Sequence, residues 1–296
     1  MPEFTTLISG LSFTECPRWR DGRLYVSDFY TQRVLAVAMD GAAETLAHVP
    51  QQPSGLGFLP DGRLLIVSMR DRRLLRRETD GSLSVYADLS ALASWHLNDM
   101  LVDHDGYAWV GNFGFDLMSG APARATELIC VAPDRTAKVV AGGLGFPNGM
   151  ALTPDGRTLI LAETTMNRLS AFNVALGSLS ERRTWAAFGD PPASTDIGEM
   201  IGQVAVAPDG ICLDAEGAVW VADAAHGRLI RVAEGGSILE ELTANGVGLF
   251  ACMLGGDQGR TLFACAAPTF QEAEASVHHR ASILMAEVEV PHAGLP

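Results

Sequence analysis

Residues 146–163 read FPNGMALTPDGRTLILAE, and this stretch decides the fold. Two apolar runs flank a polar turn that closes on Asp155-Gly156. An Asp-Gly pair between apolar runs is a strong signal of a β-hairpin, because the turn requires residues that accept a positive φ. The stretch therefore predicts two neighbouring antiparallel strands joined by a tight turn.

The same arrangement recurs along the whole chain. A turn glycine followed by an apolar strand occurs at positions 22, 62, 106, 156, 217 and 259, with spacings of 40, 44, 50, 61 and 42 residues. The strands expected after these glycines cover 24–27, 64–68, 107–110, 158–161, 218–221 and 261–264. A repeat of about 40–50 residues with four strands per unit is typical of a propeller blade.

The rest of each repeat supports two further strands. In the first repeat a third strand is expected at 33–37, and fourth strands are expected at 44–49, 83–87, 137–141, 183–188 and 237–242. The sixth repeat ends with a strand at 282–288 and lacks a fourth, which residues 3–9 can supply. We therefore predict an all-β protein: one six-bladed β-propeller domain spanning 1–296, with the N-terminal strand closing the last blade and removing an exposed edge. A two-sheet sandwich array is the alternative. Only 88–95 is expected to hold a helical turn or two.

Composition narrows the possible partners. The formal charge is −14, which argues against a nucleic-acid partner and against an anionic membrane surface. No apolar run approaches the roughly 18 residues that a membrane helix needs. The five cysteines, at 16, 130, 212, 252 and 265, form no CxxC motif, and the N-terminus lacks the pattern of a signal peptide. We expect reduced thiols and a cytoplasmic location.

Aligning the repeats on their turn glycines identifies one equivalent position in each blade. Counting back eight residues, or seven in the first repeat, gives Glu15, Ser54, Asn98, Asn148, Asp209 and Ala251. The innermost strand of a blade lines the central channel, so these residues are expected to meet at one mouth of it. Singly, Asn and Asp at a strand end also suit an ordinary turn.

Four members of this ring offer oxygen donors. The carboxylates of Glu15 and Asp209 and the amides of Asn98 and Asn148 carry a combined charge of −2. Such a set suits one divalent cation whose shell is completed by water. Ca²⁺ is the first expectation, and Zn²⁺, Mn²⁺ or Mg²⁺ are the alternatives.

The segments 15–19, 98–103, 146–156 and 208–214 resemble the SMP-30/gluconolactonase/luciferin-regenerating-enzyme-like family of six-bladed propellers, and the similarity covers essentially the whole chain. The resemblance implies a divalent ion held by Glu15, Asn148 and Asp209, with Asn98 binding the ion or the substrate. It also implies a small-molecule lactone as substrate. Diisopropylfluorophosphatase, a distant relative, hydrolyses organophosphates with a similar ligand set. A phosphotriester hydrolase and a non-catalytic ligand-binding propeller therefore stay open as alternatives.

The resemblance also implies roles for single residues. The cation would polarise the lactone carbonyl, and Asp209 is the candidate for both ligand and general base. Coordination lowers the basicity of a carboxylate, so Asp209 could instead orient the water. His96 stands where sugar-lactone members often carry an arginine, and Asp116 stands where some members carry an acidic residue that contacts sugar. With Asn98, these two residues are the expected substrate contacts.

The surroundings of the predicted mouth are aromatic. The stretch 111–116 contains two phenylalanines, and Phe29, Tyr30 and Trp95 are expected nearby. We therefore predict a pocket less polar than that of a gluconolactonase, suited to a bulkier or aryl-bearing lactone or ester. The interval 180–203 is expected to be an insertion that forms a lid, and Glu163 is a further candidate substrate contact. We expect Cys16, which stands where the family usually has glycine, to be a packing residue.

Overall fold

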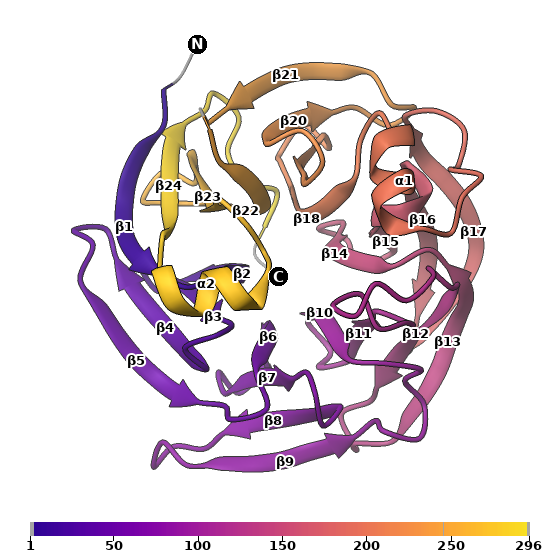
Figure 1. The fold of residues 1–296 in the computed structure, drawn as a ribbon. Helices are drawn as coiled ribbons and strands as arrows, with labels where there is room; N and C mark the ends of the chain where they lie inside the picture. The colour runs from indigo at the N-terminus through magenta and orange to yellow at the C-terminus, as the bar shows by residue number, and fades with distance from the viewer. Residues whose placement is uncertain (1–2, 245, 295–296) are drawn as a thin grey trace.

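The computed structural model, which describes residues 3–244 and 246–294, shows six four-stranded antiparallel sheets arranged as blades around a central channel (Figure 1). In every blade the four strands follow one another in space from an inner strand at the channel to an outer strand at the rim. The predicted six-bladed propeller is confirmed.

Blades one to three contain β2 (Thr14–Arg20), β3 (Arg23–Asp28), β4 (Arg33–Ala38) and β5 (Ala43–His48); β6 (Pro53–Phe58), β7 (Leu64–Ser68), β8 (Arg73–Arg77) and β9 (Leu83–Asp88); and β10 (Leu97–Val102), β11 (Ala108–Asn112), β12 (Thr126–Val131) and β13 (Ala137–Leu144). Blades four to six contain β14 (Pro147–Leu152), β15 (Thr158–Glu163), β16 (Arg168–Ala175) and β17 (Ser178–Ala187); β18 (Pro208–Leu213), β19 (Val219–Asp223), β20 (Arg228–Val232) and β21 (Ile238–Thr243); and β22 (Gly248–Gly255), β23 (Thr261–Ala267), β24 (Ala281–Glu287) and β1 (Thr5–Leu11).

The ring closes where the two ends of the chain meet in one blade. Strand β1 pairs antiparallel with β24, with Thr5 opposite Met285 and Leu11 opposite Ala281. The first and last segments of the sequence thus share blade six, as the missing fourth strand predicted. This pairing gives β24 a partner on both sides and completes blade six with a fourth strand.

Helical structure is sparse in the described residues. It consists of α1 (Ile197–Gln203), α2 (Glu272–His278) and a 3₁₀ turn, η1 (Thr164–Met166). The interval 180–203 is only partly an insertion, because its first third belongs to β17, the fourth strand of blade four. The rest of the interval is inserted between blades four and five and ends in α1. Within the interval 88–95, the Leu92 and Ala93 N–H groups donate to Leu89 O at 3.0 and 2.9 Å, which closes one helical turn as expected, and no longer helix forms. No helix of the described chain has the length and hydropathy to cross a membrane.

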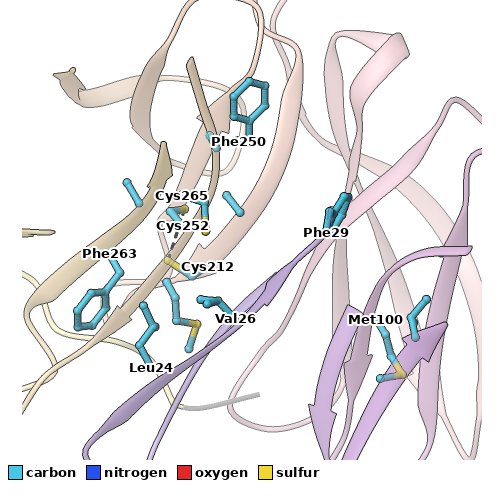
Figure 2. Packing of buried hydrophobic residues seen from close by; sticks show 14 of the residues in the cluster. Leu24, Val26, Phe29, Met100, Cys212, Phe250, Cys252, Phe263 and Cys265 are labelled. Atoms are coloured by element: carbon cyan, nitrogen blue, oxygen red, sulfur yellow. Dashed lines mark hydrogen bonds between the residues drawn. The ribbon is translucent and has the colours of Figure 1, made fainter. Parts of the chain in front are cut away.

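The core lies between adjacent blades, where apolar faces of neighbouring sheets meet. Trp109 and Trp220 are its largest fully buried side chains. Figure 2 shows Cys212, Cys252 and Cys265 grouped among apolar side chains. The Cys212 and Cys252 sulfurs lie 3.8 Å apart as free thiols. These thiols pack as small apolar groups, which is the usual behaviour of buried cysteine.

Candidate active site

Each inner strand carries a β-bulge near one mouth of the channel. The ladder between β14 and β15 skips from Pro147 to Met150, and the ladder between β18 and β19 skips from Pro208 to Ile211. Asn148 and Asp209 therefore sit inside bulges. A bulge breaks the alternation of a strand and re-aims its side chains. Irregularities also cover Asn98, between Leu97 and Met100, and directly follow Glu15.

Two of the four donors, Asn148 and Asp209, are followed by glycine, because neighbouring inner strands touch there. A Cβ atom on Gly149 would lie 2.5 Å from Ile211 N, and one on Gly210 would lie 2.5 Å from Ala251 Cβ. Glycine therefore permits the close packing of the inner strands. The corresponding residue of blade one is Cys16, whose φ is +54° and whose Sγ lies 3.7 Å from Ser54 Oγ.

The four predicted oxygen donors come together at this mouth, all lining one cavity. They lie on β2, β10, β14 and β18, and each is buried, with between 6% and 9% of its surface exposed. Each donor comes from a different blade, so the bulges gather residues that lie up to almost 200 positions apart in the sequence.

The site concentrates negative charge in a buried place. Burial, followed by the nearby Asp209 and Asp99 carboxylates, raises the pKa of Glu15 well above its usual value. Burial and Asp99 likewise raise the pKa of Asp209. The described cation beside these groups is Arg18, whose Nη2 lies 3.0 Å from Asp99 Oδ1. One guanidinium against three carboxylates leaves a deficit of positive charge that a divalent cation would fill.

The two amides have their N–H groups directed into the protein. Asn148 Nδ2 donates to Thr164 Oγ1 at 3.2 Å, and Thr164 Oγ1 in turn donates to Pro208 O at 2.8 Å. Asn98 Nδ2 donates to Pro147 O at 3.5 Å. Each amide therefore has its carbonyl oxygen left to accept or coordinate.

The chemistry of the donor set fits a hard cation. Within residues 3–244 and 246–294, no group of three or more His, Cys, Asp or Glu residues is placed to hold a metal ion. The set at the mouth is instead two carboxylates and two amides. An all-oxygen set of this kind suits Ca²⁺ or Mg²⁺, whereas Zn²⁺ prefers nitrogen and sulfur ligands.

The cavity that contains these donors has a volume of about 160 Å³. Its other walls are mainly apolar and come from strand ends, loops and the helical segments η1 and α1. Half of the chain's twelve phenylalanines line it: Phe13, Phe29, Phe113, Phe146, Phe250 and Phe270. Thr164 and Thr165 of η1 also line it, and α1 contributes Ile197 and Ile201. The lining is therefore mainly apolar, and the end of the interval 180–203 forms part of it through α1. Whether the pocket is less polar than that of a gluconolactonase, and whether this interval acts as a lid, stay predictions.

Two predicted substrate contacts lie outside the cavity lining. The His96 ring stacks on Trp95, with centroids 5.1 Å apart, and lies 6.5 Å from the ring of Phe113, which does line the cavity. Burial, and then the Arg70 charge, lower the pKa of His96. Asp116 accepts the Ser119 N–H at 3.1 Å within its own loop. Their roles in substrate binding stay predictions.

Other ring and loop residues lie elsewhere than the sequence pattern suggested. Ser54 and Ala251 are buried and do not line the cavity. In blade six Phe250 takes the lining position, because that bulge contains one unpaired residue and the bulges of the other blades contain two.

Glu163 is fully buried and binds Arg168 at 2.9 Å and Arg182 at 2.8 Å, so its environment is that of a structural ion pair.

Several lining residues carried no signal in the sequence. Phe13, Phe146 and Phe270 are single apolar residues in loops, and Ile197 and Ile201 lie in an interval without a repeat pattern. Thr164 and Thr165 follow the second strand of blade four, and that position after a strand end was the one clue available for them. Of the aromatic residues expected at the mouth, Phe29, Tyr30 and Phe113 line the cavity, and Trp95 and Phe115 do not.

Comparison with known proteins supports the fold and identifies the family. Residues 13–267 match the family described as the SMP-30/Gluconolactonase/LRE-like region. A 6-deoxy-6-sulfogluconolactonase from Pseudomonas putida is 26% identical over 254 residues, covering 84% of this chain and 81% of that protein. A gluconolactonase from Xanthomonas campestris shares the fold with a TM-score of 0.73 at 23% identity, over 98% of this chain and 90% of that one. Regucalcin from Agrobacterium tumefaciens, a calcium-binding protein, shares it with a TM-score of 0.77 at 19% identity, over 97% and 93% of the two chains. The family match spans most of the chain and includes all four oxygen donors, so the chain belongs to the SMP-30/gluconolactonase/LRE-like family.

Proposed function

We propose that this protein is a metal-dependent hydrolase that opens a lactone ring, with one divalent cation held by Glu15, Asn98, Asn148 and Asp209. The observation that carries the proposal is the convergence of these four donors, from four blades, beside an excess of buried negative charge. The similarity to a sulfogluconolactonase and to a gluconolactonase supports lactone as the substrate class. The calcium-binding relative supports Ca²⁺ as the ion.

The reaction is the addition of water to the lactone carbonyl carbon. The bond between that carbon and the ring oxygen then breaks, the ring oxygen takes up a proton, and the product is a hydroxy acid that ionises at neutral pH. A bound divalent cation supplies Lewis-acid polarisation of the carbonyl oxygen and compensates the negative charge that develops there.

Asp209 is the residue proposed to position the attacking water and to receive its proton. Burial raises the pKa of its carboxyl, and a neighbouring cation opposes that effect. We therefore assign orientation of the water as its main contribution. Asn148 is held by its bond to Thr164, which keeps its carbonyl oxygen aimed at the same site.

The apolar walls contribute by limiting the water around the reacting groups. Phe113 and Phe146 pack edge to face with centroids 4.8 Å apart, and Phe13 and Phe250 do so at 4.9 Å. Charges in such a water-poor cavity interact more strongly than charges at the surface. The walls therefore strengthen the effect of every charged or polar group around the carbonyl.

The test is proton release by a panel of lactones, measured in a pH-stat. Protein stripped with a chelator should be inactive, and one of Ca²⁺, Mg²⁺, Mn²⁺ or Zn²⁺ should restore activity at one ion per chain. Asp209→Asn should lower kcat by at least 100-fold, whereas Asp257→Asn, in the exposed turn between β22 and β23, should not.

A chromogenic phosphotriester tested in parallel distinguishes the alternative hydrolase. Faster turnover of the phosphotriester than of every lactone would replace the lactonase proposal. Tight metal binding with no turnover of either class would make the protein a binding propeller.

A further inference from the structure

The cavity offers few groups for recognising hydroxyls. Besides the four oxygen donors, its described polar lining residues are Thr164, Thr165 and Tyr30. The Thr164 hydroxyl donates to Pro208 O, and the Tyr30 hydroxyl donates to Phe270 O. No Arg, Lys, His or Gln occurs among the described lining residues. A sugar lactone carries several hydroxyls, and each one buried without a partner costs binding free energy.

The apolar wall is continuous on two sides of the site. On one side Phe13 packs on Phe29 at 5.3 Å and on Phe250 at 4.9 Å, and Phe250 packs on Phe270 at 6.4 Å between ring centroids. On the other side lie Phe113 and Phe146. These edge-to-face contacts fix the rings in place, so the wall exists before any ligand binds.

The outer rim of the cavity is apolar as well. Ile197 and Ile201 lie one turn apart on α1 and therefore share a helix face. Met200, on another face of α1, is buried, and Asp196 caps the helix by accepting the Glu199 N–H at 3.0 Å. Ile201 and Met118 nevertheless keep 36% and 42% of their surface exposed. Apolar side chains left open at the rim of a pocket are typical of a ligand-binding surface.

We infer that the natural substrate is a lactone bearing an apolar substituent, alkyl or aryl, and not the hydroxyl-rich lactone of a sugar acid. The inference rests on the proposed lactone hydrolysis. The lactone carbonyl lies at the oxygen donors, and the substituent contacts the phenylalanine wall and the rim formed by α1 and Met118. Each methylene buried there favours binding by about 0.8 kcal/mol, which corresponds to about fourfold in affinity.

A homologous series of δ-lactones tests the inference with the metal-loaded protein. The unsubstituted ring is compared with rings carrying a methyl, propyl or pentyl side chain, and with glucono-δ-lactone. We expect kcat/KM to rise by up to about fourfold per methylene, with glucono-δ-lactone at least tenfold below the pentyl compound. A flat series, or glucono-δ-lactone as the best substrate, would overturn the inference and leave the lactonase proposal standing.

Calorimetric titration separates this inference from the proposed function. Cyclic ethers with the same side chains cannot be hydrolysed, so their affinities measure how strongly the apolar wall binds each side chain. Affinity that rises with chain length, in a protein that hydrolyses no lactone, would sink the proposed function and show an apolar ligand site. If affinity does not rise with chain length and no lactone is hydrolysed, both the inference and the proposed function are wrong.

A pair of variants links the effect to the rim. Ile201→Asn should reduce the gain per methylene to about twofold or less. Leu176→Asn makes the same chemical change at a turn residue that is 83% exposed and has a φ of +46°, which asparagine tolerates. In that control the gain in kcat/KM per methylene should equal that of the wild type. Equal gains in the two variants would contradict the role of α1. Thermal unfolding of both variants checks that each is folded.

Discussion

Arg18 and Asp99 form an ion pair beside the oxygen donors, with Arg18 Nη2 3.0 Å from Asp99 Oδ1 and neither side chain more than 6% exposed. Arg18 also donates to Met100 O at 2.6 Å, so one guanidinium joins β2 to β10 across blade two's inner strand. The pair offsets part of the effect that the Asp99 charge has on Glu15 and Asp209. Together, the three carboxylates and the one guanidinium leave a net charge of −2 for a cation to balance.

Removing Arg18 should destabilise the protein strongly. In Arg18→Met, Asp99 becomes a buried charge without its partner, and the expected loss in the free energy of unfolding is about 3–5 kcal/mol. Urea unfolding in the presence of chelator measures it. The double variant Arg18→Met/Asp99→Asn should recover part of the loss, and a double variant as unstable as the single one would show that the pair's charge is not the cause.

Replacing Glu15 by its amide should separate stability from function. In chelated protein, Glu15→Gln removes a buried charge that is repelled by Asp209 and Asp99, so we expect the free energy of unfolding to rise by about 1–2 kcal/mol. At a cation concentration 100 times its Kd, cation binding should raise the free energy of unfolding of the wild type by about 2.7 kcal/mol, and that of the variant by little. Thermal shift with and without Ca²⁺ checks both effects. A variant that is less stable than wild type without metal would contradict the charge argument.

The close approach of inner strands makes Gly210 intolerant of a side chain. A Cβ at this position would lie 2.5 Å from Ala251 Cβ, so Gly210→Ala must displace β18 or β22 and move the adjacent Asp209. We expect a loss of about 1–3 kcal/mol in unfolding free energy together with weaker metal binding.

Gly202→Ala is the matched control, because nothing lies within 4 Å of its Cβ position in α1. There alanine should be neutral or stabilise by up to about 1 kcal/mol. Similar losses in the two variants would exclude the packing explanation.

Glu163 should govern part of the acid stability. Burial alone raises the pKa of its carboxyl, but bonds from Arg168, Ser170 and the Gly145 N–H outweigh burial and leave the pKa below its usual value. The stability that this lowered pKa provides is complete above pH 4.5, the usual value, and is lost as the pH falls through the lower folded-state pKa.

The variant Glu163→Gln reports this contribution. It should be about 2–4 kcal/mol less stable than wild type at pH 7, and the difference should shrink below pH 4.5. Urea unfolding across pH 3–7 measures the gap. A gap that stays constant down to pH 3 would show that the carboxylate charge is not responsible.

The blades were predictable because the signals for them are local. An Asp-Gly turn and the apolar runs beside it lie within about fifteen residues, and every expected strand overlaps an observed one. The gathering of Glu15, Asn98, Asn148 and Asp209 was predictable for a related reason: equivalent positions in a repeat occupy equivalent places in the ring. The same counting placed Ser54 and Ala251 at the mouth, and neither lines the cavity. For Ala251 the blade has a bulge of a different size.

The walls of the cavity were harder to predict. Phe270 reaches the mouth because the segment between β23 and β24 contains α2, and Ile201 reaches it because α1 is held by Met200 and the Asp196 cap. Both positions depend on tertiary packing of segments that have no counterpart in the other repeats. His96 shows that closeness in sequence does not place a side chain in the cavity wall: it is two residues from Asn98, yet its ring stacks on Trp95 and is not among the lining residues.

The closure of the ring has a consequence for when the blades can fold during synthesis. Thr5 Oγ1 donates to Met285 O, 280 residues later, so β1 is synthesised long before the strand with which it pairs. At about 5–20 residues per second, translation separates the two strands by roughly 15–60 seconds. During that time five blades have their own hairpins and can form as they emerge from the ribosome. The N-terminal strand, by contrast, must stay unpaired until its partner appears, so sequestering residues 5–11 during synthesis would delay the final step of maturation.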